Sequence, residues 1–104
     1  MELVAVMTTV GNIEAARLMA KTVIERKLAA CAQLSPIESF YPWEGALQHD
    51  QEIRLLFKTT KQNQAALESA LAQLHPYAVP AICAFDIGAV NAAYAHWVSA
   101  NCEP

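Results

Sequence analysis

Apolar residues show strand-like spacing in four segments of the chain. Short apolar runs or an alternation of apolar and polar residues predict strands over residues 2–9, 28–45, 51–60 and 81–87. The clearest case is the third segment, where Ile53, Leu55 and Phe57 alternate with charged side chains. This alternation is typical of a strand with one buried face. The turn before this strand is expected within the sequence GALQH at 45–49.

Helix-like spacing of three and four residues fills the intervals between these strands. It predicts helices over residues 13–27, 61–74 and 91–101, with Asn12 and Thr60 as caps of the first two. Pro76 ends the second helix near Leu74, because proline forces the preceding residue out of helical geometry. His75 therefore lies at a helix C-terminus, where the helix dipole favours positive charge, so a histidine there has a structural explanation without a ligand.

The order of these elements predicts an α+β fold for a single domain over residues 1–104. A β-α-β unit, a hairpin and a second β-α-β unit form the split pattern of the ferredoxin-like fold, here with an extra C-terminal helix. Right-handed crossovers then give an antiparallel sheet with strand order 4-1-3-2. Pro36 and Pro42 place the second strand at a sheet edge, and we expect it to be bent or bulged.

The composition indicates self-association. Hydrophobic residues make up 55% of the chain and charged residues only 16%, against about 25% charged in ordinary soluble domains. The edge strand carries Phe40, Tyr41 and Trp43, which would be covered by pairing with another chain. The net charge of −3 and the scattered basic residues argue against a nucleic-acid partner.

The termini and cysteines predict a cytoplasmic protein. The N-terminus has neither the basic flank nor the length of a signal peptide, and no apolar run approaches a membrane span. The three cysteines are odd in number and lack a C-x-x-C pair. Cys31 and Cys83 fall on opposite edges of the predicted sheet, so they cannot share a disulfide or a metal within one subunit.

Five short sequences resemble the CutA divalent-cation tolerance family, and they occur in the family's order over nearly the whole chain. They are LAAC at 28–31, IESFYPWEG at 37–45, LLFKTT at 55–60, LHPYAVP at 74–80 and YAHWV at 94–98. The resemblance implies a ferredoxin-like subunit in a cytoplasmic homotrimer, formed through sheet edges and the long hairpin. It also implies a role in tolerance of copper and other divalent cations, or in anchoring partner proteins.

The resemblance also gives candidate site residues. A bacterial family member has a copper site of one cysteine and two consecutive histidines, and these positions hold Thr8, Leu74 and His75 here. Only His75 retains a metal-ligating side chain, so it is a weak metal candidate. Relatives usually have proline where this chain has Gly11, which leaves the shape of that loop open.

Other polar residues have a structural and a functional interpretation. Trp43, Glu44 and Tyr77 are candidates for an intersubunit cleft, although assembly alone would explain the tryptophan. His49 and Asp50, beside Glu52, resemble a cation site but would also be ordinary near a turn. His96, next to a tryptophan on the last helix, fits a surface or packing role.

The sequence also bears on two other classes of function. The fold is shared with acylphosphatases, but their phosphate-binding loop needs an arginine that is missing from the first loop here, and no catalytic triad is apparent. We therefore predict a protein that is not an enzyme. The alternative is a small-molecule-sensing trimer, similar to the nitrogen-regulatory signalling proteins that bind ligands between subunits.

Overall fold

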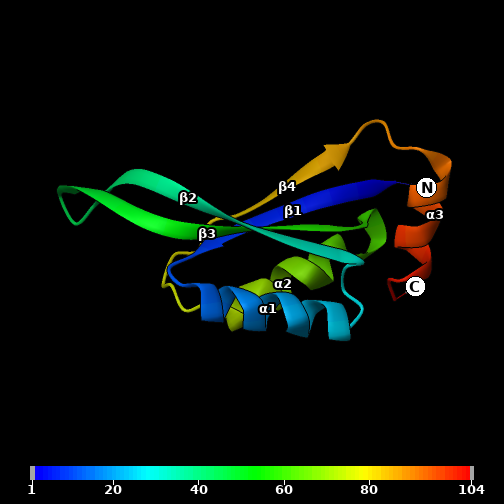
Figure 1. Ribbon diagram of the computed structural model, residues 1–104, viewed down its shortest axis with the longest axis horizontal. Helices are drawn as coiled ribbons and strands as arrows, with labels where there is room; N and C mark the ends of the chain where they lie inside the picture. The colour runs from blue at the N-terminus through cyan, green and yellow to red at the C-terminus, as the bar shows by residue number, and fades with distance from the viewer. Residues whose placement is uncertain (1, 104) are drawn as a thin grey trace.

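The computed structural model describes residues 2–103 and confirms the predicted fold class (Figure 1). Its elements are β1 (Leu3–Val10), α1 (Ile13–Glu25), β2 (Cys31–Trp43), β3 (Ala46–Thr60), a 3₁₀ turn (Lys61–Asn63), α2 (Gln64–Leu74), β4 (Ile82–Ile87) and α3 (Ala92–Ala100). The sheet order is β2-β3-β1-β4 with every neighbour antiparallel, which is the predicted order read from the other edge. Cys31 and Cys83 lie on opposite edges, as expected.

One face of the sheet carries the main core. Helices α1 and α2 lie side by side on that face (Figure 1) and pack on alternate residues of β1 and β3. The buried members from the two strands are Val4, Val6, Val10, Leu55 and Phe57. A smaller cluster at the end of the sheet joins Leu3 to Ala95, Val98 and Cys102 of the α3 region.

Side-chain caps begin the helical segments at the predicted residues. Asn12 Oδ1 accepts a hydrogen bond from Ala15 N at 2.7 Å, which satisfies one of the free amides at the start of α1. Thr60 Oγ1 accepts from Asn63 N at 3.3 Å, although the first turn there is 3₁₀ and not α-helical. The two caps confirm the sequence-based starts of both segments.

The hairpin turn is tighter than predicted. Glu44 and Gly45 have φ values of 52° and 79°, and two positive φ values in succession close a two-residue hairpin. Strand β3 therefore begins at Ala46, and the expected turn over 45–49 is wrong. The polar residues His49 and Asp50 belong to a strand and not to a turn.

Of the two distortions expected in β2, a bend or a bulge, the bulge is absent. Pro36 lies opposite Ile53 and Pro42 opposite Leu47, and the register continues through both pairs without an inserted residue. Because β2 is an edge strand, a proline can occupy a position whose backbone nitrogen faces away from β3, so no ladder bond is lost.

The outer part of the hairpin projects beyond the sheet as a two-stranded arm. Pairing between β1 and β3 ends at Val10 and Ile53, so residues 37–43 and 46–52 pair only with each other. The arm accounts for the elongated shape of 45 × 25 × 21 Å, and it forms the left end of the molecule in Figure 1. We refer to these residues and their turn as the hairpin arm. An isolated two-stranded ribbon is marginally stable in water, so the hairpin arm needs support from other surfaces.

The helix layer provides a stability test with a matched control. Leu67 of α2 is fully buried in the core, whereas Leu18 of α1 is 67% exposed. We expect Leu67→Ala to lower the free energy of unfolding by about 2–5 kcal/mol, because it removes buried methyl groups and leaves a cavity. Leu18→Ala should change it by less than about 1 kcal/mol. Chemical denaturation of both variants measures the difference, and equal effects would contradict this core assignment.

Candidate functional site

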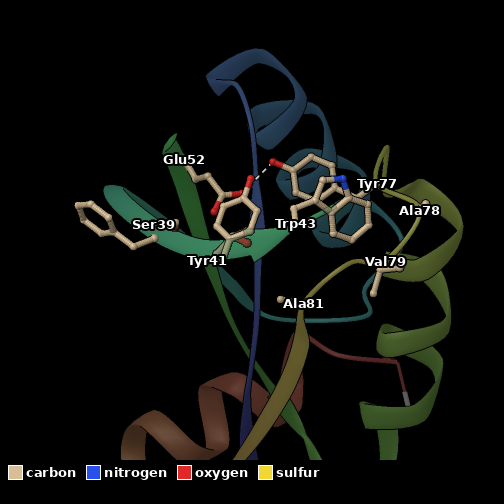
Figure 2. Close-up of a pocket in the computed structure, with 10 residues that line it drawn as sticks. Ser39, Tyr41, Trp43, Glu52, Tyr77, Ala78, Val79 and Ala81 are labelled. Atoms are coloured by element: carbon tan, nitrogen blue, oxygen red, sulfur yellow. Dashed lines mark hydrogen bonds between the residues drawn. The ribbon is translucent and has the colours of Figure 1, made fainter. Parts of the chain in front are cut away.

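A cleft of about 580 Å³ lies where the hairpin arm approaches the loop between α2 and β4. Figure 2 shows Tyr41 and Trp43 projecting from the arm near the loop that carries Tyr77 and Val79. The cleft is lined by Thr9, Ser39, Phe40, Tyr41, Trp43, Glu52, Tyr77, Ala78, Val79 and Ala81. Its volume is in the range of small-molecule sites, about 300–1,000 Å³.

Strand periodicity brings all of the arm residues that line the cleft, except Phe40, to one face. Ser39, Tyr41 and Trp43 alternate along β2, so their side chains project from the same side. Ser39 lies opposite Asp50 on β3, which places Asp50 and Glu52 on that side as well. The Tyr41 hydroxyl donates a hydrogen bond to the Asp50 carboxylate across the two strands.

The opposite wall is held by His75. Its Nδ1 accepts a hydrogen bond from the Tyr77 backbone N–H at 3.2 Å, and its Nε2 lies 2.8 Å from the carbonyl oxygen of Thr9. An accepting Nδ1 and a carbonyl partner for Nε2 together define the neutral imidazole with its proton on Nε2. His75 is only 9% exposed. It thus joins the end of β1 to the loop after α2, through both of its ring nitrogens.

Tyr77 reaches across the cleft to a buried carboxylate. Its hydroxyl donates a 2.8 Å hydrogen bond to Oε2 of Glu52, which is only 8% exposed (Figure 2). A Cβ atom on Gly11 would lie 3.1 Å from the Tyr77 hydroxyl, so a larger residue there would crowd the tyrosine. The absence of a side chain at Gly11 therefore leaves room for the Tyr77–Glu52 contact.

Both tyrosines that meet carboxylates in the cleft have raised pKa values. Burial raises the pKa of Tyr77 well above its ordinary value of 10.0, and the hydrogen bond to Glu52 raises it further. The pKa of Tyr41 is raised first by its hydrogen bond to Asp50 and then by burial. Both phenols are therefore neutral donors near pH 7, and the negative charge of the site belongs to the carboxylates.

The predicted site residues separate into different locations. Trp43 and Tyr77 both line the cleft, with exposed fractions of 48% and 39%. Glu44 is in the hairpin turn and is not among the lining residues. His49 stacks on Phe40 with a centroid distance of 4.1 Å. His96 lies on the exposed side of α3.

The residues at the family's copper positions do not form a chelating set within one subunit. Thr8 is fully buried, with a hydroxyl that has no hydrogen-bond partner, and Leu74 packs against the main core. Both nitrogens of His75 face backbone groups. Across residues 2–103, no group of three or more His, Cys, Asp or Glu side chains is arranged to hold a metal ion. A tight copper site does not fit this single chain.

The burial of Glu52 and its contact with Tyr77 are the features of the site that sequence reasoning missed. In the sequence Glu52 is the last of five consecutive polar residues, 48–52, and nothing local marks it as buried. Its partner Tyr77 is 25 residues away. The alternation over residues 51–60 places Glu52 on the polar face of the predicted strand, so it gave no sign that a distant tyrosine would cover the carboxylate.

Comparison with known proteins gives a consistent set of relatives. The family model for the CutA1 divalent ion tolerance protein matches residues 4–101. The divalent-cation tolerance protein CutA of Thermus thermophilus is 41% identical over 97 residues, which span 92% of this chain and 94% of that protein.

Solved structures agree with this match. The crystal structure of CutA1 from Pyrococcus horikoshii aligns with a TM-score of 0.95 and 34% identity, over 97% of this chain and 99% of that one. The structure described as the periplasmic divalent cation tolerance protein CutA from Archaeoglobus fulgidus aligns with a TM-score of 0.94 and 31% identity, over the same shares. In the part of the chain that the structure describes, no helix is long and apolar enough to cross a membrane.

The raised tyrosine pKa values predict the alkaline behaviour of the protein. The three tyrosines of the chain should all ionise above pH 10, with Tyr77 last. Tyr77→Phe should remove the highest step of the tyrosinate absorbance titration, whereas Tyr94→Phe should leave it in place. Since the folded-state pKa of Tyr77 exceeds the unfolded value of 10.0, its contribution to stability is complete below pH 10 and is lost as the pH rises further. A highest step that persists in Tyr77→Phe would contradict the buried contact with Glu52.

Proposed function

Because the chain belongs to the CutA1 divalent ion tolerance family, we propose that it acts in the tolerance of, or response to, divalent metal cations such as copper. We further propose that it does so as a cytoplasmic homotrimer, by binding and not by catalysis. The observation that carries the proposal is the family match over residues 4–101. The three cysteines are free thiols, which suits a reducing compartment.

The uncovered sheet face supports assembly. Side chains that alternate with the main core point away from α1 and α2, and among them are Met7, Leu56, Cys83 and Phe85. Phe85 is 53% exposed, and Leu47 on the hairpin arm is 76% exposed. Contact with further copies of the chain would cover this apolar face and support the two-stranded arm.

Binding of a divalent cation would draw on more than one subunit or on water. His75 is the only metal-ligating side chain at the three family positions, and it would have to give up the Thr9 or Tyr77 backbone group to coordinate an ion. A single imidazole is too few donors for a tight copper site. We therefore expect His75 to act first as a structural bridge and only weakly as a ligand.

The chemistry of the cleft supports binding over catalysis. Its lining includes hydroxyl groups and one carboxylate, but it has neither the histidine nor the cysteine of a nucleophile–base pair. The size of the cleft favours a second candidate function, a small-molecule-sensing or protein-anchoring trimer resembling the nitrogen-regulatory signalling proteins.

Light scattering tests the assembly. At micromolar concentration we expect about three times the subunit mass of 11.3 kDa. Trp43→Ala should weaken assembly by a few kcal/mol if the ring is buried between chains. Leu18→Ala, on the outer side of the helix layer, serves as the control. A mass equal to one subunit would contradict the homotrimer.

A thermal-shift screen followed by copper calorimetry tests the ligand class. Copper and zinc chlorides should raise the melting temperature by mass action, and nucleotides or small anions should not. His75→Ala should keep the copper affinity but lower the free energy of unfolding by about 1–3 kcal/mol, because two backbone groups lose their partner. A submicromolar copper site that disappears in His75→Ala would show instead that His75 is a true ligand, and a shift with nucleotides alone would favour the sensing trimer.

A further inference from the structure

The cleft contains the elements of a site for an organic cation. We propose that it binds a small organic ammonium ion, held between the Glu52 carboxylate and an aromatic wall formed by Tyr41, Trp43 and Tyr77. This inference rests on the proposed function only in treating the cleft as a binding site, and it names a ligand class other than a metal ion.

The charge of the cleft is negative and lacks a cationic partner. Glu52 is the one ionisable acid among the lining residues, and that set contains no lysine, arginine or histidine. Arg54 follows two positions later on the same strand face, but it forms no ion pair with Glu52. The ion pair between fixed charges within residues 2–103 is Lys61–Asp86, and the imidazole of His49 lies 3.9 Å from the carboxylate of Glu38. A buried carboxylate is costly unless it is paired, and here it receives a neutral phenol.

The surroundings of Glu52 increase its preference for a positive ligand. Asp50, on the same side of the hairpin arm, adds a second carboxylate that is also hydrogen bonded only to a phenol, that of Tyr41. An anionic ligand such as a nucleotide would face these charges without any basic side chain from the lining residues. The cleft therefore discriminates against phosphates and carboxylates.

The aromatic wall adds the second requirement for an ammonium ion. The rings of Trp43 and Tyr77 are each partly exposed at the cleft. Aromatic faces attract ammonium groups through cation–π interactions, which are strongest with tryptophan. An alkylammonium ion places its apolar carbons against such rings and its charge near the carboxylate, whereas a hydrated metal ion gains little from the rings.

The volume also fits an organic ligand better than a bare ion. A space of about 580 Å³ would leave a single metal ion with one carboxylate and several hydroxyls, which is fewer charged ligands than divalent cations usually take. A small alkylammonium ion fills more of this space, and the walls at Val79 and Ala81 are apolar.

Binding of choline, compared with its neutral carbon isostere dimethylbutanol, tests the proposal. The chain has two tryptophans, so Trp97→Phe leaves Trp43 as the only indole reporter. We expect choline to change the Trp43 emission saturably and to bind at least about tenfold more tightly than the isostere. Equal affinities would overturn the proposal, because they would show that positive charge is not recognised.

Two variants locate the site. Glu52→Gln keeps an oxygen acceptor for the Tyr77 hydroxyl but removes the charge, and we expect it to weaken choline binding at least about tenfold. Glu44→Gln removes the same charge from the nearby turn and should have little effect. An equal loss of choline affinity in the two variants would show that only the overall negative charge of the hairpin arm matters, and it would overturn the proposal. Circular dichroism checks that both variants fold, and light scattering checks that both keep the oligomeric state of the parent protein.

The divalent-cation screen separates this inference from the proposed function. If copper and zinc give no thermal shift while choline binds as described, the metal role fails and the ammonium site stands. If the metals shift the melting temperature but choline and dimethylbutanol bind equally, this inference fails and the proposed function stands.

Discussion

The shape of the cleft depends on the imidazole of His75, which bridges two segments of backbone. Its two nitrogens connect the carbonyl of Thr9, at the end of β1, to the amide of Tyr77, in the loop after α2. Both connections require the neutral ring, and both are to backbone groups, so they constrain the chain itself and not only side chains. The position of Tyr77 follows from this bridge, and the contact between Tyr77 and Glu52 follows from the position of Tyr77.

Much of the fold was predictable because it depends on local rules. The cap at Asn12, the helix end before Pro76 and the alternation from Ile53 to Phe57 each depend on a few neighbouring residues, and each is confirmed. The turn at Glu44 was not predictable in the same way. A glutamate with a φ of 52° is uncommon, so the sequence does not favour a turn at this residue. The polar residues that follow are as common in loops as in exposed strands, so they do not show where the strand begins.

The site was less predictable than the fold, because its contacts are long range. Trp43 and Tyr77 could be named from the sequence, but the burial of Glu52 could not, since it depends on a partner 25 residues away. His75 was placed correctly at the end of α2, yet its expected interaction with the helix dipole requires a charge that its hydrogen bonds do not allow. The role of Gly11 likewise depends on a distant residue. A Cβ atom at this position would lie 3.1 Å from the Tyr77 hydroxyl.

A copper site and the cleft require different side chains, and in this chain they involve different residues. The copper positions of the family need thiolate or imidazole donors, whereas Thr8 is buried, Leu74 packs against the core, and both ring nitrogens of His75 contact backbone groups. The cleft offers one buried carboxylate, protonated phenols and an exposed indole, which are poor copper donors but suit a soft organic cation. Within the single chain, the copper positions therefore lack a donor set, while the cleft contains one carboxylate and no basic side chain among its lining residues.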